Sequence, residues 1–378
     1  MSKETTLELE SLTMPKWGMS MTEGKVVAWL KEPGSTVEAG EEVFEVETEK
    51  IVNVIESQRS GTLLRQVVEL DETCPVGALV GVLGPKDATP EQVDEFAAKF
   101  QKRFKAVAEK EGQASPVQPT DLTVNDQTIR YLSMGEGGLP VLLIHGMGSD
   151  LNSWLFNHST LAAEREVIAL DLPAHGGSSK SLQTGSMEEL AGVVDGLLDA
   201  LNISRIHLIG HSLGGLVTAE LALQKPERIA SLTMISSHGP DTVVNKSFLE
   251  AYLAANKRRD LKNVLQQLVT DPELITRELI ESILRVKRIE GVQESWGKII
   301  YSGILNPAND NDSILTRLKM PVQIIFGAED QIAAAPAQGT LPEGVGLHIL
   351  EDAGHIPHME SAARVNAILS VFLADSGD

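Results

Sequence analysis

The chain has 378 residues and carries 32 lysine and arginine residues against 53 aspartate and glutamate residues, a formal net charge of −21. This length is about two to three times that of a usual domain, so more than one folding unit is expected, and an ordinary apolar share of 42% excludes a disordered chain. The negative charge repels phosphate backbones and anionic lipid, which excludes nucleic acids and membrane surfaces as expected partners.

The N-terminus and the single cysteine indicate the compartment. Residues 1–6 are charged and lack the apolar core of a signal peptide, and no stretch reaches the roughly 18 apolar residues of a membrane span. The lone Cys74 excludes an internal disulfide and a multi-cysteine zinc site. We therefore expect a cytoplasmic protein without a bound metal.

Residues 1–84 are predicted to form a small all-β domain. Short apolar-rich segments alternate with turn signals such as Pro33-Gly34 and Ser60-Gly61, a spacing typical of a small sandwich or barrel. The domain is strongly acidic, with seven basic and fifteen acidic residues. The expected strands cover residues 7–12, 24–30, 42–47, 51–55, 62–68 and 79–83.

Residues 85–116 are predicted to form a linker that contains one amphipathic helix. Thr89-Pro90-Glu91 supplies a helix start, because it combines an N-cap residue, a proline in the first turn and an early acid. The apolar face of this helix either packs on the chain's own domains or docks a partner enzyme. Its members recur at three- and four-residue steps: Val93, Phe96, Phe100, Phe104 and Val107.

Residues 117–378 alternate apolar runs with helical patterns, which predicts a mainly parallel sheet covered by helices on both faces. Between about residues 240 and 311 the strand signals stop and charged amphipathic stretches such as 260–269 and 272–288 take over, so this interval is predicted to be a helical cap. The expected strands cover residues 140–145, 167–172, 206–210, 232–236, 322–327 and 347–350.

A serine between two glycines marks the first candidate site. The sequence Gly-His-Ser-Leu-Gly at residues 210–214 follows an apolar strand and precedes a helical run, which is the context of a nucleophile elbow. Glycines flank Ser212 because a larger side chain two residues away would collide with neighbouring backbone in such a strained turn. A glycine-rich turn with an incidental serine is the alternative.

Two later strands end in candidate partners for this serine. Asp330 follows Gly-Ala-Glu at 327–329, and His355 follows Gly354 after the final strand, so the chain order is Ser, Asp, His. This arrangement resembles the α/β-hydrolase fold, whose acid and histidine occupy these positions. The resemblance implies a triad of Ser212, Asp330 and His355, with Glu329 as the competing acid.

The same resemblance implies an oxyanion hole. His-Gly-Met-Gly at residues 145–148 ends an apolar strand and is similar to the family's HG turn, so the N–H groups of Met147 and Leu213 are the expected donors. Other polar residues near these motifs are interpreted as packing or turn residues: His145, Asp171, His175, His358 and Glu360.

Residues 45–52 form a predicted hairpin that places Lys50 at a tight turn. The surrounding sequence, PKWGMSMTEG at 15–24 and SGTL at 60–63, resembles the lipoyl domain of 2-oxo acid dehydrogenase complexes. In that family the lysine at this turn carries lipoic acid, so the resemblance implies lipoic acid bound covalently to Lys50. The usual Asp before the lysine is Glu49 here, a conservative difference. The biotinyl carrier domain is the alternative, but its usual Met-Lys-Met is absent.

A lipoyl domain joined to an α/β-hydrolase resembles the dihydrolipoyl acetyltransferase components of acetoin dehydrogenase complexes. That resemblance implies two partner enzymes in a multienzyme complex: a thiamine-diphosphate-dependent acetoin dehydrogenase component and a dihydrolipoamide dehydrogenase. Ordinary acyltransferase components carry a His-x-x-x-Asp-Gly signature on another fold. Here the Asp-Gly pair at 195–196 is preceded by Ala191 in place of histidine, and no basic subunit-binding domain follows the lipoyl domain.

The implied activity is transfer of an acetyl group from the lipoyl arm to coenzyme A through an acyl-serine on Ser212. The alternatives are a carboxylester or thioester hydrolase that carries a lipoyl domain, and a carrier and scaffold with an idle hydrolase domain. Basic residues at 257–259, 285, 287 and 288 either bind the phosphates of coenzyme A or form solvated helix faces.

Overall fold

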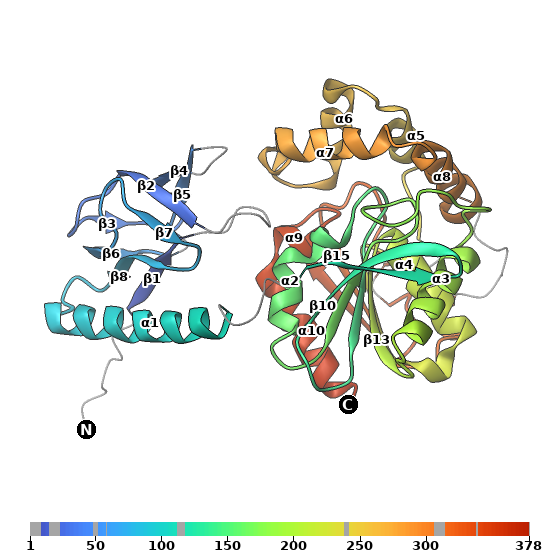
Figure 1. The fold of residues 1–378 in the computed structure, drawn as a ribbon, viewed down its shortest axis with the longest axis horizontal. Coiled ribbons are helices and arrows are strands. Elements are labelled where there is room, and N and C mark those ends of the chain that lie inside the picture. The colour runs from blue at the N-terminus through green and yellow to red at the C-terminus, as the bar shows by residue number, and fades with distance from the viewer. Residues whose placement is uncertain are drawn as a thin grey trace. The chain divides into compact units, whose positions relative to one another are not determined.

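The computed structural model divides the chain by its contacts into two compact units, Met1–Pro116 and Val117–Asp378 (Figure 1). No helix in the described part of the chain combines the length and apolar composition that a membrane crossing requires. The residues that the structure describes are 9–14, 23–47, 52–57, 59–111, 118–237, 242–305, 314–337 and 339–377.

The first unit contains two four-stranded sheets, with strand orders β1-β8-β6-β3 and β5-β4-β2-β7. Apolar side chains of both sheets form one buried cluster, because alternate residues of a strand such as β2 point inward. Phe44 and Leu63 lie in this cluster and are fully buried. The strands are β1 (Glu10–Thr13), β2 (Glu23–Trp29), β3 (Thr36–Val37), β4 (Glu42–Glu47), β5 (Val52–Glu56), β6 (Gly61–Gln66), β7 (Thr73–Pro75) and β8 (Leu79–Gly84).

The helix predicted within the linker is α1 (Pro90–Glu111), and it packs on the first unit. Thr89 and Gln92 exchange hydrogen bonds as a capping box, since each side-chain oxygen accepts the other residue's backbone N–H. Val93 and Ala97 are buried against Leu79 and Val82 of β8. The apolar face of α1 therefore packs on the chain's own domain, and the helix belongs to the first unit by its contacts.

The second unit is built on one eight-stranded sheet in the order β16-β15-β14-β13-β11-β12-β10-β9. The strands from β16 to β12 are parallel, whereas β10 pairs antiparallel with both β12 and β9. The strands are β9 (Thr120–Val124), β10 (Gln127–Met134), β11 (Val141–Ile144), β12 (Val167–Leu170), β13 (Ile206–His211), β14 (Ile229–Ile235), β15 (Val322–Gly327) and β16 (Val345–Leu350).

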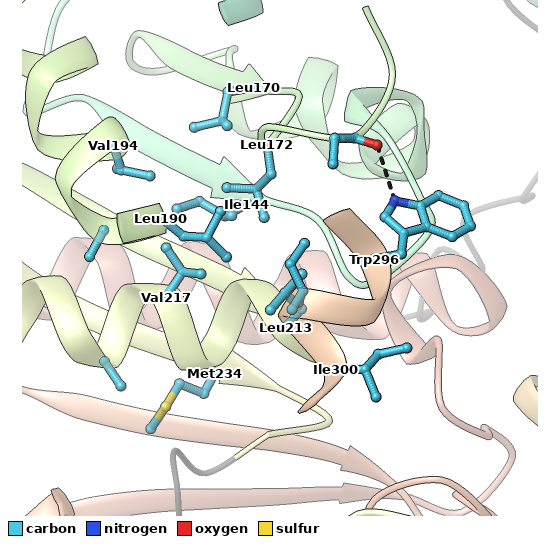
Figure 2. Close-up of a cluster of buried hydrophobic side chains, with 14 of the residues drawn as sticks. Ile144, Leu170, Leu172, Leu190, Val194, Leu213, Val217, Met234, Trp296 and Ile300 are labelled. Atoms are coloured by element: carbon cyan, nitrogen blue, oxygen red, sulfur yellow. Dashed lines mark hydrogen bonds between the residues drawn. The ribbon is translucent and has the colours of Figure 1, made fainter. Parts of the chain in front are cut away.

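Helices cover both faces of this sheet (Figure 1). Alternation along a strand splits the core into two clusters, so that Leu142 and Ile144 lie in one and Val141 and Leu143 in the other. Figure 2 shows the first cluster, where Leu190 and Val217 from two helices meet Ile144 of the sheet. The helices are α2 (Leu155–Leu161), α3 (Met187–Ala200), α4 (Leu213–Gln224), α9 (Pro357–Glu360) and α10 (Ala362–Asp375).

Between β14 and β15 the chain forms a helical cap, as the loss of strand signals predicted. Trp296 of the cap reaches the sheet cluster and donates its indole N–H to the carbonyl oxygen of Ala174 at 3.0 Å (Figure 2). The cap elements are α5 (Lys246–Ala254), α6 (Arg258–Leu265), α7 (Arg277–Lys287), α8 (Val292–Lys298) and the π-helix η5 (Ile299–Ile304). Short 3-10 turns elsewhere in the unit and cap are η1 (Leu151–Trp154), η2 (Pro226–Arg228), η3 (Gln266–Leu268), η4 (Pro272–Leu274) and η6 (Ile314–Thr316).

Candidate active site

Ser212 lies in the turn between β13 and α4 with φ of 50° and ψ of −112°, a conformation that is costly for a residue with a side chain. The flanking glycines make the turn possible. A Cβ on Gly210 would lie 2.3 Å from the carbonyl oxygen of Gly214, and a Cβ on Gly214 would lie 2.1 Å from that of Ile144. The predicted strand, turn and helix thus surround the serine, and the backbone is strained at Ser212 itself.

The structure brings the three predicted triad residues together. The ring of His355 lies between the other two side chains: its Nε2 is 3.0 Å from Ser212 Oγ, and its Nδ1 is 2.9 Å from Asp330 Oδ2 and 3.0 Å from Oδ1. The side chains of His355 and Asp330 are 4% and 2% exposed, so their contact is shielded from water. This is the geometry in which a serine hydroxyl can pass its proton to an imidazole.

Asp330, and not its neighbour Glu329, faces the histidine. Oδ1 of Asp330 also accepts the backbone N–H groups of Ile332 at 2.8 Å and Ala333 at 3.0 Å, which fix the carboxylate in its loop. Glu329 is exposed. The acid three residues after Gly327, which the sequence pattern favoured over Glu329, is therefore the one that lies beside the imidazole.

A second histidine supports the first, and the sequence analysis did not identify it. His211 Nε2 lies 2.8 Å from the backbone oxygen of His355 and its ring lies beside the His355 ring, with centroids 5.1 Å apart. Burial, together with nearby His358, holds the pKa of His211 well below 6.5, so the ring is neutral and Nε2 donates to that carbonyl. The signal was available, because His211 is the residue between the first glycine and the serine of the elbow motif.

The turn predicted to complete an oxyanion hole lies beside the serine. A Cβ on Gly146 would be 3.3 Å from Ser212 Cβ, and the N–H of Ser149 closes the turn onto the Gly146 oxygen at 3.2 Å. Met147 lies inside this turn. Leu213 is the first residue of α4, and N–H groups in the first turn of a helix lack carbonyl partners within the helix. The turn that contains Met147 and the start of α4 therefore both lie beside Ser212.

His145 and Asp171, two of the polar residues interpreted as structural, make structural contacts. His145 Nε2 accepts the N–H of Leu172 at 3.0 Å, and Asp171 accepts the N–H groups of Leu151 at 2.8 Å and Gly177 at 2.6 Å. Burial lowers the pKa of His145 and raises the pKa of Asp171. These groups hold the loops that surround the elbow.

Lys287 of the cap is buried, in contrast to the phosphate-binding role considered from the sequence. Its ammonium donates to the carbonyl oxygens of Tyr252 and Leu253 at the end of α5, and burial lowers its pKa to about 8. Tyr252 in turn directs its hydroxyl to the Gly148 oxygen at 3.5 Å, beside the oxyanion turn. Lys287 therefore orders the cap next to the site.

Lys50 lies outside the described residues. The flanking strands β4 and β5 are described, and the residues on either side of its segment, Glu47 and Val52, are paired in an antiparallel ladder. Beside them, Lys25 of β2 forms an ion pair with Glu47 at 2.9 Å. The hairpin that was predicted to carry the lysine is thus present up to the residues that bound the turn.

Two family models match the chain: one described as the alpha/beta hydrolase fold over residues 140–362, and one described as biotin-requiring enzyme over residues 10–83. Among solved structures, a meta-cleavage product hydrolase from Pseudomonas fluorescens aligns over 69% of this chain and 99% of its own length. Its TM-score of 0.61 at 24% identity shows a shared fold.

Curated relatives extend over both units. The dihydrolipoyllysine-residue acetyltransferase component of the acetoin cleaving system from Pseudomonas putida is 43% identical over 97% of this chain and 99% of its own length. The component of the same name from Cupriavidus necator is 36% identical over 99% of this chain and 100% of its own length. The chain therefore belongs to the family of dihydrolipoyllysine-residue acetyltransferase components of acetoin cleaving systems, acyltransferases that join a lipoyl-type domain to an alpha/beta-hydrolase domain.

Proposed function

We propose that the chain moves an acetyl group from a lipoyl group on Lys50 to coenzyme A by way of an ester on Ser212. The observation that carries this proposal is the hydrogen-bonded line from Asp330 through His355 to Ser212, in a chain that also contains a lipoyl-type domain. An acyltransferase needs an activated nucleophile to accept the acyl group, and this line supplies one.

Lys50 is the proposed attachment site of lipoic acid. Glu47, the last residue of β4, is exposed and pairs with Val52 of β5, which suits a lysine in the following turn that a modifying enzyme and several active sites must reach. When bound there, the lipoyl group supplies the acetyl group as a thioester on an extended arm. Attachment also removes the positive charge of the lysine.

In the proposed acylation step, Ser212 Oγ attacks the thioester carbonyl as His355 Nε2, 3.0 Å away, accepts the hydroxyl proton. The Asp330 carboxylate accepts a hydrogen bond from Nδ1–H of His355, which fixes the tautomer of the ring and stabilises its cation. The N–H groups of Met147 and Leu213 stabilise the oxyanion. The carbon–sulfur bond then breaks, His355 returns the proton to the leaving thiolate, and an acetyl ester remains on Ser212.

In the second step, the thiol of coenzyme A loses its proton to His355 and its sulfur attacks the same carbonyl. The ester bond to Ser212 Oγ breaks, and the proton returns from His355 to the hydroxyl. Water can replace the thiol in this step, in which case acetate forms. Because the nucleophile, base and oxyanion donors serve both acceptors, access of each acceptor to the ester decides the product.

The lipoyl arm requires one partner enzyme that loads the acetyl group and another that reoxidises the dithiol. A thiamine-diphosphate-dependent acetoin dehydrogenase component loads the acetyl group, and a dihydrolipoamide dehydrogenase reoxidises the dithiol. The relatives' name, which refers to an acetoin cleaving system, supports this assignment. The Asp-Gly pair that resembles half of another acyltransferase signature has a structural role here, since Asp195 forms an ion pair with Arg228 at 2.7 Å.

Acetyl-dihydrolipoamide tests the proposal directly. The purified protein is incubated with this thioester, with and without coenzyme A, and acetyl-CoA and acetate are quantified for the wild type and for Ser212→Ala. We expect acetyl-CoA from the wild type and a loss of about three to six orders of magnitude in the variant. Acetate formed at the same rate with and without coenzyme A would instead identify a hydrolase.

A further inference from the structure

One piece of the cap lies directly on the loop that carries His355. We call residues 268–270, between α6 and α7, the cap segment, and residues 351–356, between β16 and α9, the histidine loop. The backbone N–H of His355 donates to the carbonyl oxygen of Leu268 at 2.8 Å. A Cβ on Gly354 would lie 2.7 Å from that oxygen and 3.2 Å from the Cα of Val269. The two backbones are in contact, and the glycine permits this approach.

The carboxylate of Glu360 accepts hydrogen bonds from both segments. Glu360, at the end of α9, accepts the backbone N–H of Thr270 at 2.7 Å and the Thr270 hydroxyl at 2.9 Å on its Oε1. Its Oε2 accepts the N–H of Gly354 at 2.8 Å. Both oxygens are thus used, one on the cap segment and one on the histidine loop. Hydrogen bonds to an ionised acceptor are stronger than those between neutral groups.

The cap also contacts the acid loop and the oxyanion turn. The N–H of Asn245 donates to the Ile332 oxygen at 2.7 Å, and Val244 forms an antiparallel bridge with Ala333, next to Asp330. Tyr252 contacts Gly148 on the other side of the serine. The first two contacts use backbone atoms, whereas the contact at Glu360 depends on one side chain and can be removed by substitution.

We propose that Glu360 is a positioning residue that holds the cap segment closed over the histidine loop and thereby favours transfer of the acetyl group to coenzyme A over its hydrolysis. The inference rests on the proposed function, because it concerns the acetyl ester on Ser212. Thiolysis and hydrolysis of that ester both use His355 as base. A segment that opens beside His355 admits water to the base, and the sulfur nucleophile gains nothing from the extra solvent.

The test compares Glu360→Gln with Glu351→Gln. Glutamine has one acceptor oxygen, so its amide N–H₂ must face either Gly354 N–H or Thr270 N–H, both of which are donors, and the contact with one of the two segments is lost. Glu351 is an exposed carboxylate of the histidine loop and serves as the matched control. Each protein receives acetyl-dihydrolipoamide. The initial burst of thiol release reports acylation, the later steady rate without coenzyme A reports hydrolysis, and acetate and acetyl-CoA are quantified when coenzyme A is present.

For Glu360→Gln we expect the ratio of acetate to acetyl-CoA to rise about tenfold, because the loss of one charge-assisted hydrogen bond increases the population of the open cap segment by about that factor. The acylation burst should be retained. The Glu351→Gln protein keeps the wild-type ratio. A wild-type ratio in Glu360→Gln would overturn the inference, and so would equal losses of both products, which indicate a general structural defect.

A second pair of variants decides the matter if Glu360→Gln does not fold. Thr270→Val removes the hydroxyl donor while the backbone N–H stays, so a smaller rise of about threefold is expected, and Thr270→Ser restores the wild-type ratio. An unchanged ratio in Thr270→Val would contradict the inference. Failure of the proposed function is distinguishable, because it would show as acetyl-CoA formation that persists in Ser212→Ala, or as wild-type acetate formation at the same rate with and without coenzyme A.

Discussion

Replacement of Asp330 by asparagine separates the role of the acid from its structural contacts. The amide oxygen can retain the N–H groups of Ile332 and Ala333 that Oδ1 accepts at 2.8 and 3.0 Å. The amide N–H₂ then faces His355 Nδ1, which at present donates to Asp330 at 2.9 Å. Two donors cannot pair, so the ring adopts the tautomer with its hydrogen on Nε2, and Nε2 can no longer accept the proton of Ser212.

We expect this change to lower kcat for acetyl transfer by about 10⁴-fold, which corresponds to about 5.4 kcal/mol of activation free energy. The assay is acetyl-CoA formation from acetyl-dihydrolipoamide, with thermal unfolding as the measure of an intact fold. The adjacent Glu329→Gln is the control, because Glu329 is exposed and an amide there is expected to leave kcat unchanged. If Asp330→Asn kept most of the activity while Glu329→Gln lost it, the assignment of the acid would be refuted.

Two further predictions concern the cap and the arm. Burial lowers the pKa of Lys287 from 10.5 to about 8, so between these values the unfolded chain holds a proton that the folded chain has lost, and the free energy of unfolding rises with pH. Below pH 8 both states are protonated and this slope vanishes. We expect Lys287→Met to reduce the increase in the free energy of unfolding, measured by urea titration, between pH 7 and 10. The control Lys262→Met replaces an exposed lysine and should keep the wild-type increase. Equal pH slopes in the two variants would be inconsistent with a buried ammonium at Lys287. Lys50→Arg should abolish acetyl-CoA formation from acetoin by the reconstituted system yet leave turnover of free acetyl-dihydrolipoamide unchanged; retained acetoin-dependent turnover would place the arm elsewhere.

The parts of the fold that follow local patterns could be predicted from the sequence. The buried parallel strand β11 is a continuous apolar run, and the elbow around Ser212 has glycines where added side chains would collide. The strands at one end of the sheet, β9 and β10, were missed because their apolar residues are interspersed with polar ones and form no continuous apolar run. The Asn125-Asp126 pair between them was an available signal in the sequence, because these residue types tolerate positive φ. In the structure their φ values are 48° and 62°, as a two-residue hairpin turn requires.

Contacts between distant segments account for most of what could not be predicted. Glu360 bonds to Thr270, 90 residues away, and His211 supports His355 across 144 residues. Lys287 looks like part of a basic helix face in the sequence, but in the fold its side chain is buried and its ammonium reaches the carbonyl oxygens at the end of α5. Helical periodicity shows which residues share one face of a helix, but which element packs against that face is known only from the fold.

In the proposed reaction the acetyl group passes through Ser212 on its way to coenzyme A. Rapid quenching of the wild-type protein mixed with acetyl-dihydrolipoamide, followed by peptide mass spectrometry, detects this intermediate. We expect an acetyl group on the peptide that contains Ser212, formed before any product and transferred to acetyl-CoA when coenzyme A is added. Rapid formation of acetyl-CoA with no acetyl group on Ser212 at any time would contradict the proposed reaction.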